Sequence, residues 1–400
     1  MKNTELLAPA GTYEKMVTAF KFGADAVYFA GKKFGLRAFA GNFDDNEIET
    51  AVQYAHERNK KVYITINILA HEDDFEGLEE YLLYLEKVGV DAVIVADIGV
   101  LAFVKKVTPN MEVHISTQAN VLNSYSINLL ATLGVKRIIL ARELNIEEIK
   151  KIRSKIPEHI DLECFVHGAM CISYSGRCLL SNYLANRDSN RGACVQACRW
   201  QYCITEKNRE GEQYEIQEDK RGTYILNSKD LCLIEHLEEL KNAGVCSFKI
   251  EGRMKSEYYV ATVVNAYRRA MDGEKDIEML KAELEKASHR LYTTGFMFND
   301  DKKEHLETSY PVQTSEFMAV VKEDTKDGVT KIEQRNRFKE GDTLEILSES
   351  ENFNKTIKVE PMKNEKGEIV TDAKRVQEIL YLPTDLQLKK DDILRMKKEK

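Results

Sequence analysis

Six of the eight cysteines in this 400-residue chain gather within 62 residues. Clustered thiolates are the usual ligands of zinc and of iron–sulfur clusters. The spacing lacks the paired CxxC knuckles of structural zinc and differs from the ferredoxin spacings, so it predicts a metal or cluster site without deciding between them. Cys164 and Cys246 lie in strand-like runs and are expected to be packing residues. The six clustered cysteines are Cys171, Cys178, Cys194, Cys198, Cys203 and Cys232.

Polar residues on four strand-like runs form a second group of candidates. His114, Ser116 and Gln118 alternate along one run, so their side chains are expected on one face. Carboxylate, imidazole and guanidinium groups at strand ends can transfer protons or bind a carboxylate or phosphate. The alternative is a buried salt-bridge network that closes the fold. The catalytic candidates are His167, Glu163, Arg253, Glu251, Arg142 and Gln118.

Residues 1–273 alternate β-branched runs with amphipathic helical stretches. A count of eight such strands favours a (β/α)8 TIM-type barrel over an open doubly wound sheet. No glycine-rich dinucleotide fingerprint follows the first strand, which also favours the barrel. The predicted strands are 5–11, 25–31, 61–67, 91–97, 112–118, 137–143, 161–168 and 247–253.

A Cys-rich insertion, about residues 169–232, interrupts the barrel after its seventh strand. Barrel enzymes carry their catalytic groups where the carboxyl ends of the strands meet, an end called the mouth below. The insertion is therefore expected on the catalytic face. Residues 274–314 are predicted to be a helical connector. Residues 315–400 alternate short strands with turns, which predicts a small antiparallel β-barrel.

Composition limits the partners of the chain. The net charge is −8, which argues against a generally basic nucleic-acid binder. Residues 171–203 nevertheless hold four arginines against one aspartate, either as a phosphate-binding patch or as structural ion pairs. The sequence contains no apolar run of about 18 residues, so no membrane span is expected. The N-terminal residues lack the apolar core of a signal peptide, and a cytoplasmic protein is therefore expected. The HExxH, GxSxG and GxxxxGK[ST] motifs are absent.

The stretch ECFVHGAMCISYSGRCLLS, residues 163–181, resembles the signature of the peptidase U32 family. The segments LLAPAG, STQAN, RGACVQACRW and KIEGRMKS also resemble family segments. The resemblance covers residues 5–272, and the C-terminal strands resemble a module of longer members. It implies either a collagenase-like peptidase or an oxygen-independent hydroxylase.

Hydroxylases of this family hold a [4Fe–4S] cluster through four cysteines, so the resemblance implies such a cofactor here. The KIEGRMKS segment and the two-part layout resemble the branch that hydroxylates tRNA uridine in a prephenate-dependent reaction. Cys198 is the reserve ligand, since one branch uses a Cys-x3-Cys pair. The positions that match the cluster ligands are Cys171, Cys178, Cys194 and Cys232.

The leading hypothesis is therefore the formation of 5-hydroxyuridine at the tRNA wobble position. Arg253 or Arg142 would bind prephenate, a dicarboxylate, and the insertion arginines would contact tRNA phosphates. A second subunit of the same family is left open as a partner. A peptidase and a tRNA-binding scaffold without catalysis are the competing hypotheses. Aromatic residues of the insertion that could stack a splayed base, or simply pack, are Tyr174, Trp200 and Tyr202.

Overall fold

The computed structural model describes residues 4–32, 34, 42–170, 178, 180–185, 187, 194–197, 218–219, 222–223, 229–298 and 312–398. Two compact units are distinguished. The barrel unit comprises Met1–Met16, Asp25–Lys255 and Arg290–Pro311, and the C-terminal unit comprises Val17–Ala24, Ser256–His289 and Val312–Lys400. The predicted domain boundaries at residues 273 and 314 stay predictions, because compactness alone does not show which segments fold independently.

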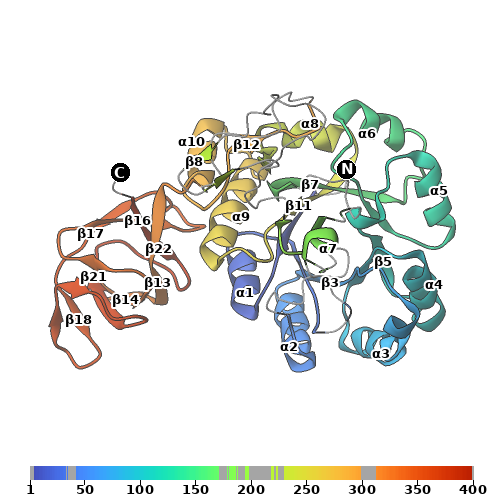
Figure 1. The fold of residues 1–400 in the computed structure, drawn as a ribbon. Coiled ribbons are helices and arrows are strands. Elements are labelled where there is room, and N and C mark those ends of the chain that lie inside the picture. The colour runs from blue at the N-terminus through green and yellow to red at the C-terminus, as the bar shows by residue number, and fades with distance from the viewer. Residues whose placement is uncertain are drawn as a thin grey trace. The chain divides into compact units, whose positions relative to one another are not determined.

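Eight parallel strands of the barrel unit close into a ring, which confirms the predicted TIM-type barrel (Figure 1). Each strand pairs with the next along the chain, and the ring closes where β11 pairs with both β7 and β1. Nearly all of their residues are buried, as expected for parallel strands covered by helices. The strands are β1 (Glu5–Pro9), β2 (Ala26–Phe29), β3 (Lys61–Ile66), β4 (Ala92–Val95), β5 (Glu112–Ile115), β6 (Arg137–Ile139), β7 (Asp161–Ala169) and β11 (Val245–Ile250).

Amphipathic helices follow the strands along the chain, and those between β2 and β7 lie outside the ring (Figure 1). Helix α2 illustrates why they form. The carboxylate of Asp44 accepts a hydrogen bond from the Glu47 N–H, and Glu47 accepts one from the Asp44 N–H, which makes a capping box. The helices are α1 (Tyr13–Lys21), α2 (Asp45–His56), α3 (Leu78–Val88), α4 (Ile98–Val107), α5 (Ser124–Thr132), α6 (Ile146–Arg153), α7 (Leu180–Ala185), α8 (Leu237–Asn242), α9 (Glu257–Met271) and α10 (Ile277–Leu284). No helix of the described residues is long and apolar enough to cross a membrane.

Two short strands extend the sheet at the mouth. Strand β10 (Asp230–Cys232) pairs antiparallel with the end of β7, and β12 (Tyr292–Thr293) pairs parallel with β10. Strand β10 is fixed by Asp230, which is buried, accepts from the Arg290 N–H at 3.1 Å and forms an ion pair with the Arg290 guanidinium at 3.3 Å. Residues 290–298, predicted as part of a connector, therefore help to build the mouth.

The C-terminal unit carries an antiparallel sheet, as predicted, in the order β17-β16-β22-β13-β14-β21-β18-β19. Alternate residues along its strands point to one face, and the buried core on that face includes Met318, Ile332 and Leu394. Strands β15 (Phe338–Lys339) and β20 (Asp372–Ala373) make a separate pair, as do β8 (Glu218–Asp219) and β9 (Gly222–Thr223) of the barrel unit. The remaining strands are β13 (Ser315–Lys326), β14 (Val329–Gln334), β16 (Thr343–Leu347), β17 (Thr356–Lys358), β18 (Met362–Asn364), β19 (Ile369–Val370), β21 (Ile379–Pro383) and β22 (Ile393–Lys397).

A buried ion-pair network joins α10 to this sheet. The fully buried Arg395 on β22 donates to both carboxylate oxygens of Glu283 on α10, at 2.5 and 2.8 Å. Its Nε donates to Glu345 on β16 at 2.7 Å, and Lys286 donates to Glu345 at 2.6 Å. Because these charges lie away from water, each depends on its partner.

Replacing Arg395 with methionine is expected to lower the free energy of unfolding of the C-terminal unit by about 3–5 kcal/mol, since it removes two charged hydrogen bonds from the buried Glu283 carboxylate and leaves it paired with Lys286 at 2.9 Å. Calorimetry of the full chain would measure the shift of the transition. The matched control is Arg337→Met, because Arg337 makes a similar two-bond contact with Asp372, at 2.9 Å for both bonds, on the exposed surface. Equal losses in the two variants would contradict the expectation.

Candidate functional site

The strands end earlier than the sequence analysis predicted. Strand β5 ends at Ile115, so the alternation expected along its run stops there, and Ser116 caps the short 3-10 turn Thr117–Ala119. Strands β6 and β11 end at residues 139 and 250. The predicted strand ranges were therefore too long, and four candidates follow strand ends at the mouth: Gln118, Arg142, Glu251 and Arg253.

Glu163 lies inside the barrel rather than at the mouth. It is the third residue of the nine-residue β7 and is fully buried. Its carboxylate accepts from Lys249 Nζ at 2.9 Å, Arg137 Nη1 at 3.1 Å and Ser247 Oγ at 3.2 Å. Glu5 on β1 accepts from Arg137 at 2.5 Å. These contacts cross the closing seam of the ring, which is the buried network that the sequence analysis gave as the alternative.

Burial and neighbouring charges determine whether Glu163 and His114 are ionised. Burial alone would raise the pKa of Glu163, but the cations of Lys249 and Arg137 outweigh burial and hold that pKa below its usual value. His114, also placed in the interior and fully buried, hydrogen-bonds with Glu112 at 2.8 Å. Burial lowers the pKa of His114, although the bond with Glu112 opposes the shift. His114 is thus neutral in the folded protein near pH 7.

A neutral buried histidine makes stability depend on pH. The unfolded chain takes up a proton at His114 below about pH 6.5, whereas the folded chain does so only at lower pH. The unfolding free energy is therefore expected to fall as pH drops from about 7 to about 5.5. His114→Gln is expected to flatten this slope in denaturant titrations, and the exposed His159→Gln is expected to keep it. An unchanged slope in His114→Gln would contradict the assignment.

Three predicted site residues meet at the end of β7. Cys232 on β10 pairs directly with His167, and the Glu251 N–H donates to the His167 carbonyl at 2.9 Å. Gly168 makes this approach possible, because a Cβ there would lie 2.7 Å from the Glu251 carbonyl oxygen and its φ is +111°. The ring of Tyr292 on β12 lies against the His167 ring, with centroids 5.3 Å apart. An imidazole, a carboxylate and a thiol thus share one edge of the mouth.

Two cationic candidates lie at neighbouring strand ends. Arg142 donates to the Ala169 carbonyl at 2.9 Å and lies 4.0 Å above the Phe165 ring. Arg253 is buried and donates to Asn42 Oδ1 at 2.9 Å. In these contacts each guanidinium group donates to a neutral oxygen.

Three of the four predicted cluster ligands are described, and within the described residues none of the three forms a disulfide: Cys178, Cys194 and Cys232. The sulfur of Cys194 accepts from the Gln196 N–H at 3.4 Å and from Ser181 Oγ at 3.7 Å, an environment that suits a thiolate ligand. Across the described ranges, no group of three or more His, Cys, Asp or Glu side chains is placed to hold a metal ion. The ligand set therefore stays a prediction.

Other sequence predictions lie outside the described residues. These are Cys171, Cys198 and Cys203, the insertion arginines other than Arg187, and the three aromatic residues Tyr174, Trp200 and Tyr202.

Sequence reasoning missed several residues that complete these contacts. Charged residues in apolar strands are rarely buried unless they are paired, so Arg137 and Lys249 could have been matched with Glu163. Asn67, directly after β3, hydrogen-bonds with Gln118, but no spacing rule indicated that the two loops meet. Tyr292 lay in the segment predicted as a connector.

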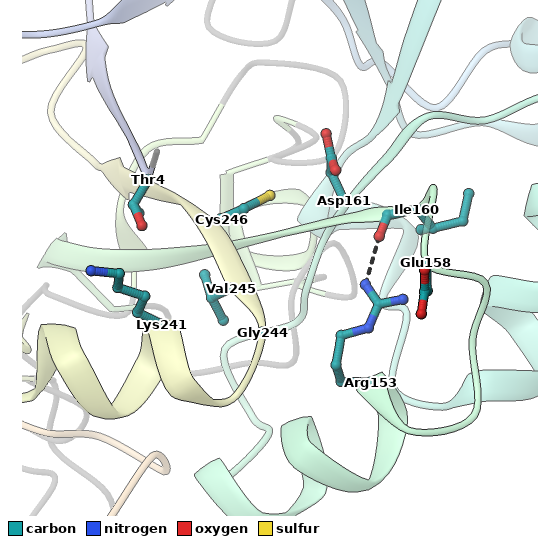
Figure 2. Close-up of a pocket in the computed structure, with 9 residues that line it drawn as sticks. All are labelled: Thr4, Arg153, Glu158, Ile160, Asp161, Lys241, Gly244, Val245 and Cys246. Carbon is teal, nitrogen blue, oxygen red and sulfur yellow. Dashed lines mark hydrogen bonds between the residues drawn. The ribbon is translucent and has the colours of Figure 1, made fainter. Parts of the chain in front are cut away.

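A cavity of about 230 Å³ lies at the opposite end of the barrel from the mouth. It is lined at the amino ends of β7 and β11 by residues that include Asp161 and Cys246, and Figure 2 shows Arg153 reaching the Ile160 carbonyl. Arg153 also donates to the Pro157 carbonyl at 2.5 Å, so it organises the loop that joins α6 to β7. The amino end of a barrel usually contributes stability rather than catalysis, and we assign this cavity no ligand.

Comparisons with known proteins agree with this layout. The chain is 36% identical to tRNA hydroxylation protein P of Escherichia coli, over 97% of this chain and 96% of that protein. It is 38% identical to tRNA hydroxylation protein P1 of Bacillus subtilis, over 98% of this chain and 95% of that protein. A 23S rRNA 5-hydroxycytidine synthase of Escherichia coli is 37% identical, over 67% of this chain and 39% of that protein.

Family assignment rests on both parts of the chain. The sequence pattern of peptidase family U32 matches residues 11–307. The pattern of the peptidase family U32 C-terminal domain matches residues 313–395. Together they span most of the 400 residues, and the chain belongs to peptidase family U32.

Proposed function

We propose that this protein hydroxylates tRNA, and that it forms 5-hydroxyuridine at the wobble position in a prephenate-dependent reaction. The observation that carries the proposal is the near full-length similarity to proteins named for tRNA hydroxylation, at 36% and 38% identity. Similarity to an rRNA hydroxycytidine synthase supports base hydroxylation as the wider chemistry. The site at the end of β7 contains groups that suit this chemistry.

The reaction would replace the C5–H of uracil with C5–OH. The uracil gains an oxygen atom and loses two electrons, and an organic hydroxyl donor loses its oxygen and takes up those electrons. We propose prephenate as this donor, with its two carboxylates bound by Arg142 and Arg253. We propose that His167 and Glu251, which meet at the end of β7, transfer a proton between base and donor.

We further propose a [4Fe–4S] cluster held by Cys171, Cys178, Cys194 and Cys232. When bound, the cluster would relay electrons or act as a Lewis acid toward the oxygen donor. The hydrogen bonds to the Cys194 sulfur and the position of Cys232 opposite His167 support this ligand set. Cys232 would then be a ligand on the strand that pairs with the proposed proton-transfer residue.

A peptidase is the second candidate, supported by the family's name. The described residues of the mouth provide no serine, histidine and aspartate in mutual hydrogen-bonding contact, and the strand pairing places Cys232 beside His167 within the proposed cluster site. An assay of gelatin cleavage by the purified protein would separate this candidate from the hydroxylase.

Anaerobically purified protein, unmodified tRNA and prephenate should give a nucleoside heavier than uridine by one oxygen atom. Mass spectrometry of the digested tRNA would detect it. A product that forms without the protein, or gelatin cleavage with no modified nucleoside, would contradict the proposed function.

A further inference from the structure

The side-chain amide of Gln118 is held in one orientation at the mouth. Its Oε1 accepts from Asn67 Nδ2 at 2.5 Å and from Ser116 Oγ at 3.3 Å. Ser116 is buried and is itself fixed, because its Oγ also accepts from the Gln118 backbone N–H at 3.3 Å. Two donors therefore meet at the amide oxygen, and the amide NH2 points away from them.

Gln118 Nε2 has no acceptor among the described residues, and the Gln118 side chain is half-buried. A second polar group lies close by in the fold. Thr65 is 3% exposed, and its Oγ1 also lacks a partner within the described part of the chain. Strand alternation puts Thr65 on the same face of β3 as Tyr63, whose hydroxyl bonds Glu5 inside the barrel. The β3–β5 side of the mouth thus offers polar groups to a ligand.

The positions of Asn67 and Gln118 in the ring relate these two amides to the proposed reaction site. Asn67 follows β3, and β3 and β7 are four strands apart in either direction around the eight-stranded ring. Asn67 therefore lies across the mouth from His167 and Cys232, whereas Gln118 follows β5, two strands from β7, and bonds Asn67 from that side. A planar base placed between the two sides would present one edge to the amides and another to the end of β7.

Uracil and cytosine differ in what they present at position 4. Uracil has a carbonyl oxygen there, which accepts a hydrogen bond, whereas cytosine has an amine, which donates. An amide that can turn over would suit either base, because it carries both a donor and an acceptor end. An amide locked with its NH2 toward the ligand suits only the carbonyl.

We propose that Gln118 determines specificity by donating from Nε2 to uracil O4 and so rejecting cytosine. The inference rests on the proposed function, since it takes a splayed pyrimidine as the ligand. Asn67 is a positioning residue, which acts on the base through Gln118.

Two variants test the orientation of the amide. Gln118→Ala removes the donor and should abolish the preference for uracil. Asn67→Asp replaces a donor with an acceptor-only carboxylate, so the Gln118 NH2 should turn toward residue 67 and present Oε1 to the base. This variant should prefer cytosine, although Gln118 itself is unchanged. The matched control is Gln53→Ala, on the outer surface of α2.

The probes are two anticodon stem–loop RNAs that differ only in uridine or cytidine at the wobble position. Binding, measured by fluorescence anisotropy without prephenate, needs no turnover. The wild type and Gln53→Ala are expected to bind the uridine loop about tenfold more tightly, as one mismatched hydrogen bond implies. Gln118→Ala should bring the two affinities to within about twofold, and Asn67→Asp should reverse the order.

Tight binding with a wild-type ratio in Gln118→Ala would overturn the inference and leave the proposed function standing. A wild type that binds both loops equally would do the same. Failure of the wild type to bind either loop would overturn the inference together with the proposed function. Thermal unfolding of each variant would confirm that the barrel is intact.

Discussion

Replacing Glu163 with alanine is expected to lower the free energy of unfolding by about 3–5 kcal/mol. The Glu163 carboxylate is fully buried and accepts from β6 and from the closing strand β11. Its removal leaves the Lys249 ammonium buried without the carboxylate that it contacts at 2.9 Å. Because those contacts span the seam that closes the ring, the loss should appear as a lower denaturant midpoint of the barrel unit.

The exposed Glu147→Ala provides the control, since Glu147 pairs with Lys150 at 2.7 Å on the surface of α6. That variant should change stability far less. If Glu163→Ala unfolds like the wild type yet loses hydroxylation, Glu163 is a catalytic residue and the structural assignment is wrong.

Cys232→Ala is expected to abolish tRNA hydroxylation and to lower iron bound per chain in anaerobically purified protein. Cys232 ends β10 and pairs with His167, so its loss would remove a proposed cluster ligand at the proton-transfer site. The backbone of β10 would remain fixed by the Asp230–Arg290 ion pair, which leaves the fold intact. Iron and sulfide analysis and the visible spectrum provide readouts that do not depend on turnover.

Cys246→Ala is the matched control. Cys246 lies on β11 at the amino end of the barrel, where its thiol donates to the Leu162 carbonyl at 3.5 Å, and burial raises its pKa to about 11. A protonated thiol at that end of the strand is a poor metal ligand. Equal iron loss in both variants, or full iron in Cys232→Ala, would contradict the proposed ligand set.

The barrel could be predicted from the sequence because strand and helix periodicities are local. All eight predicted strands form, each within a few residues of its predicted range. Their ends were less certain, since turn geometry decides them, as Ser116 does by capping the turn that carries Gln118. The role of Cys232 as a cluster ligand was predicted from family resemblance, and its pairing with His167 comes only from the structure.

The contacts that sequence reasoning missed all join distant segments. Glu163, Arg137 and Lys249 lie on three strands and meet only when the ring closes, so no window of sequence contains them together. The strand at Tyr292 pairs with β10 across about 60 residues of chain, beyond the reach of any periodicity. Strand alternation shows which face of a strand a residue lies on but not its depth, so it did not indicate that Glu163 lies inside the barrel.

Mass spectrometry of tRNA nucleosides from a strain that lacks this gene tests the central claim most directly. The strain would be complemented with the wild-type chain or with Cys232→Ala. We predict that 5-hydroxyuridine and its derivatives disappear on deletion, return with the wild-type chain and stay absent with Cys232→Ala. Unchanged 5-hydroxyuridine in the deletion strain, or full restoration by Cys232→Ala, would contradict the account.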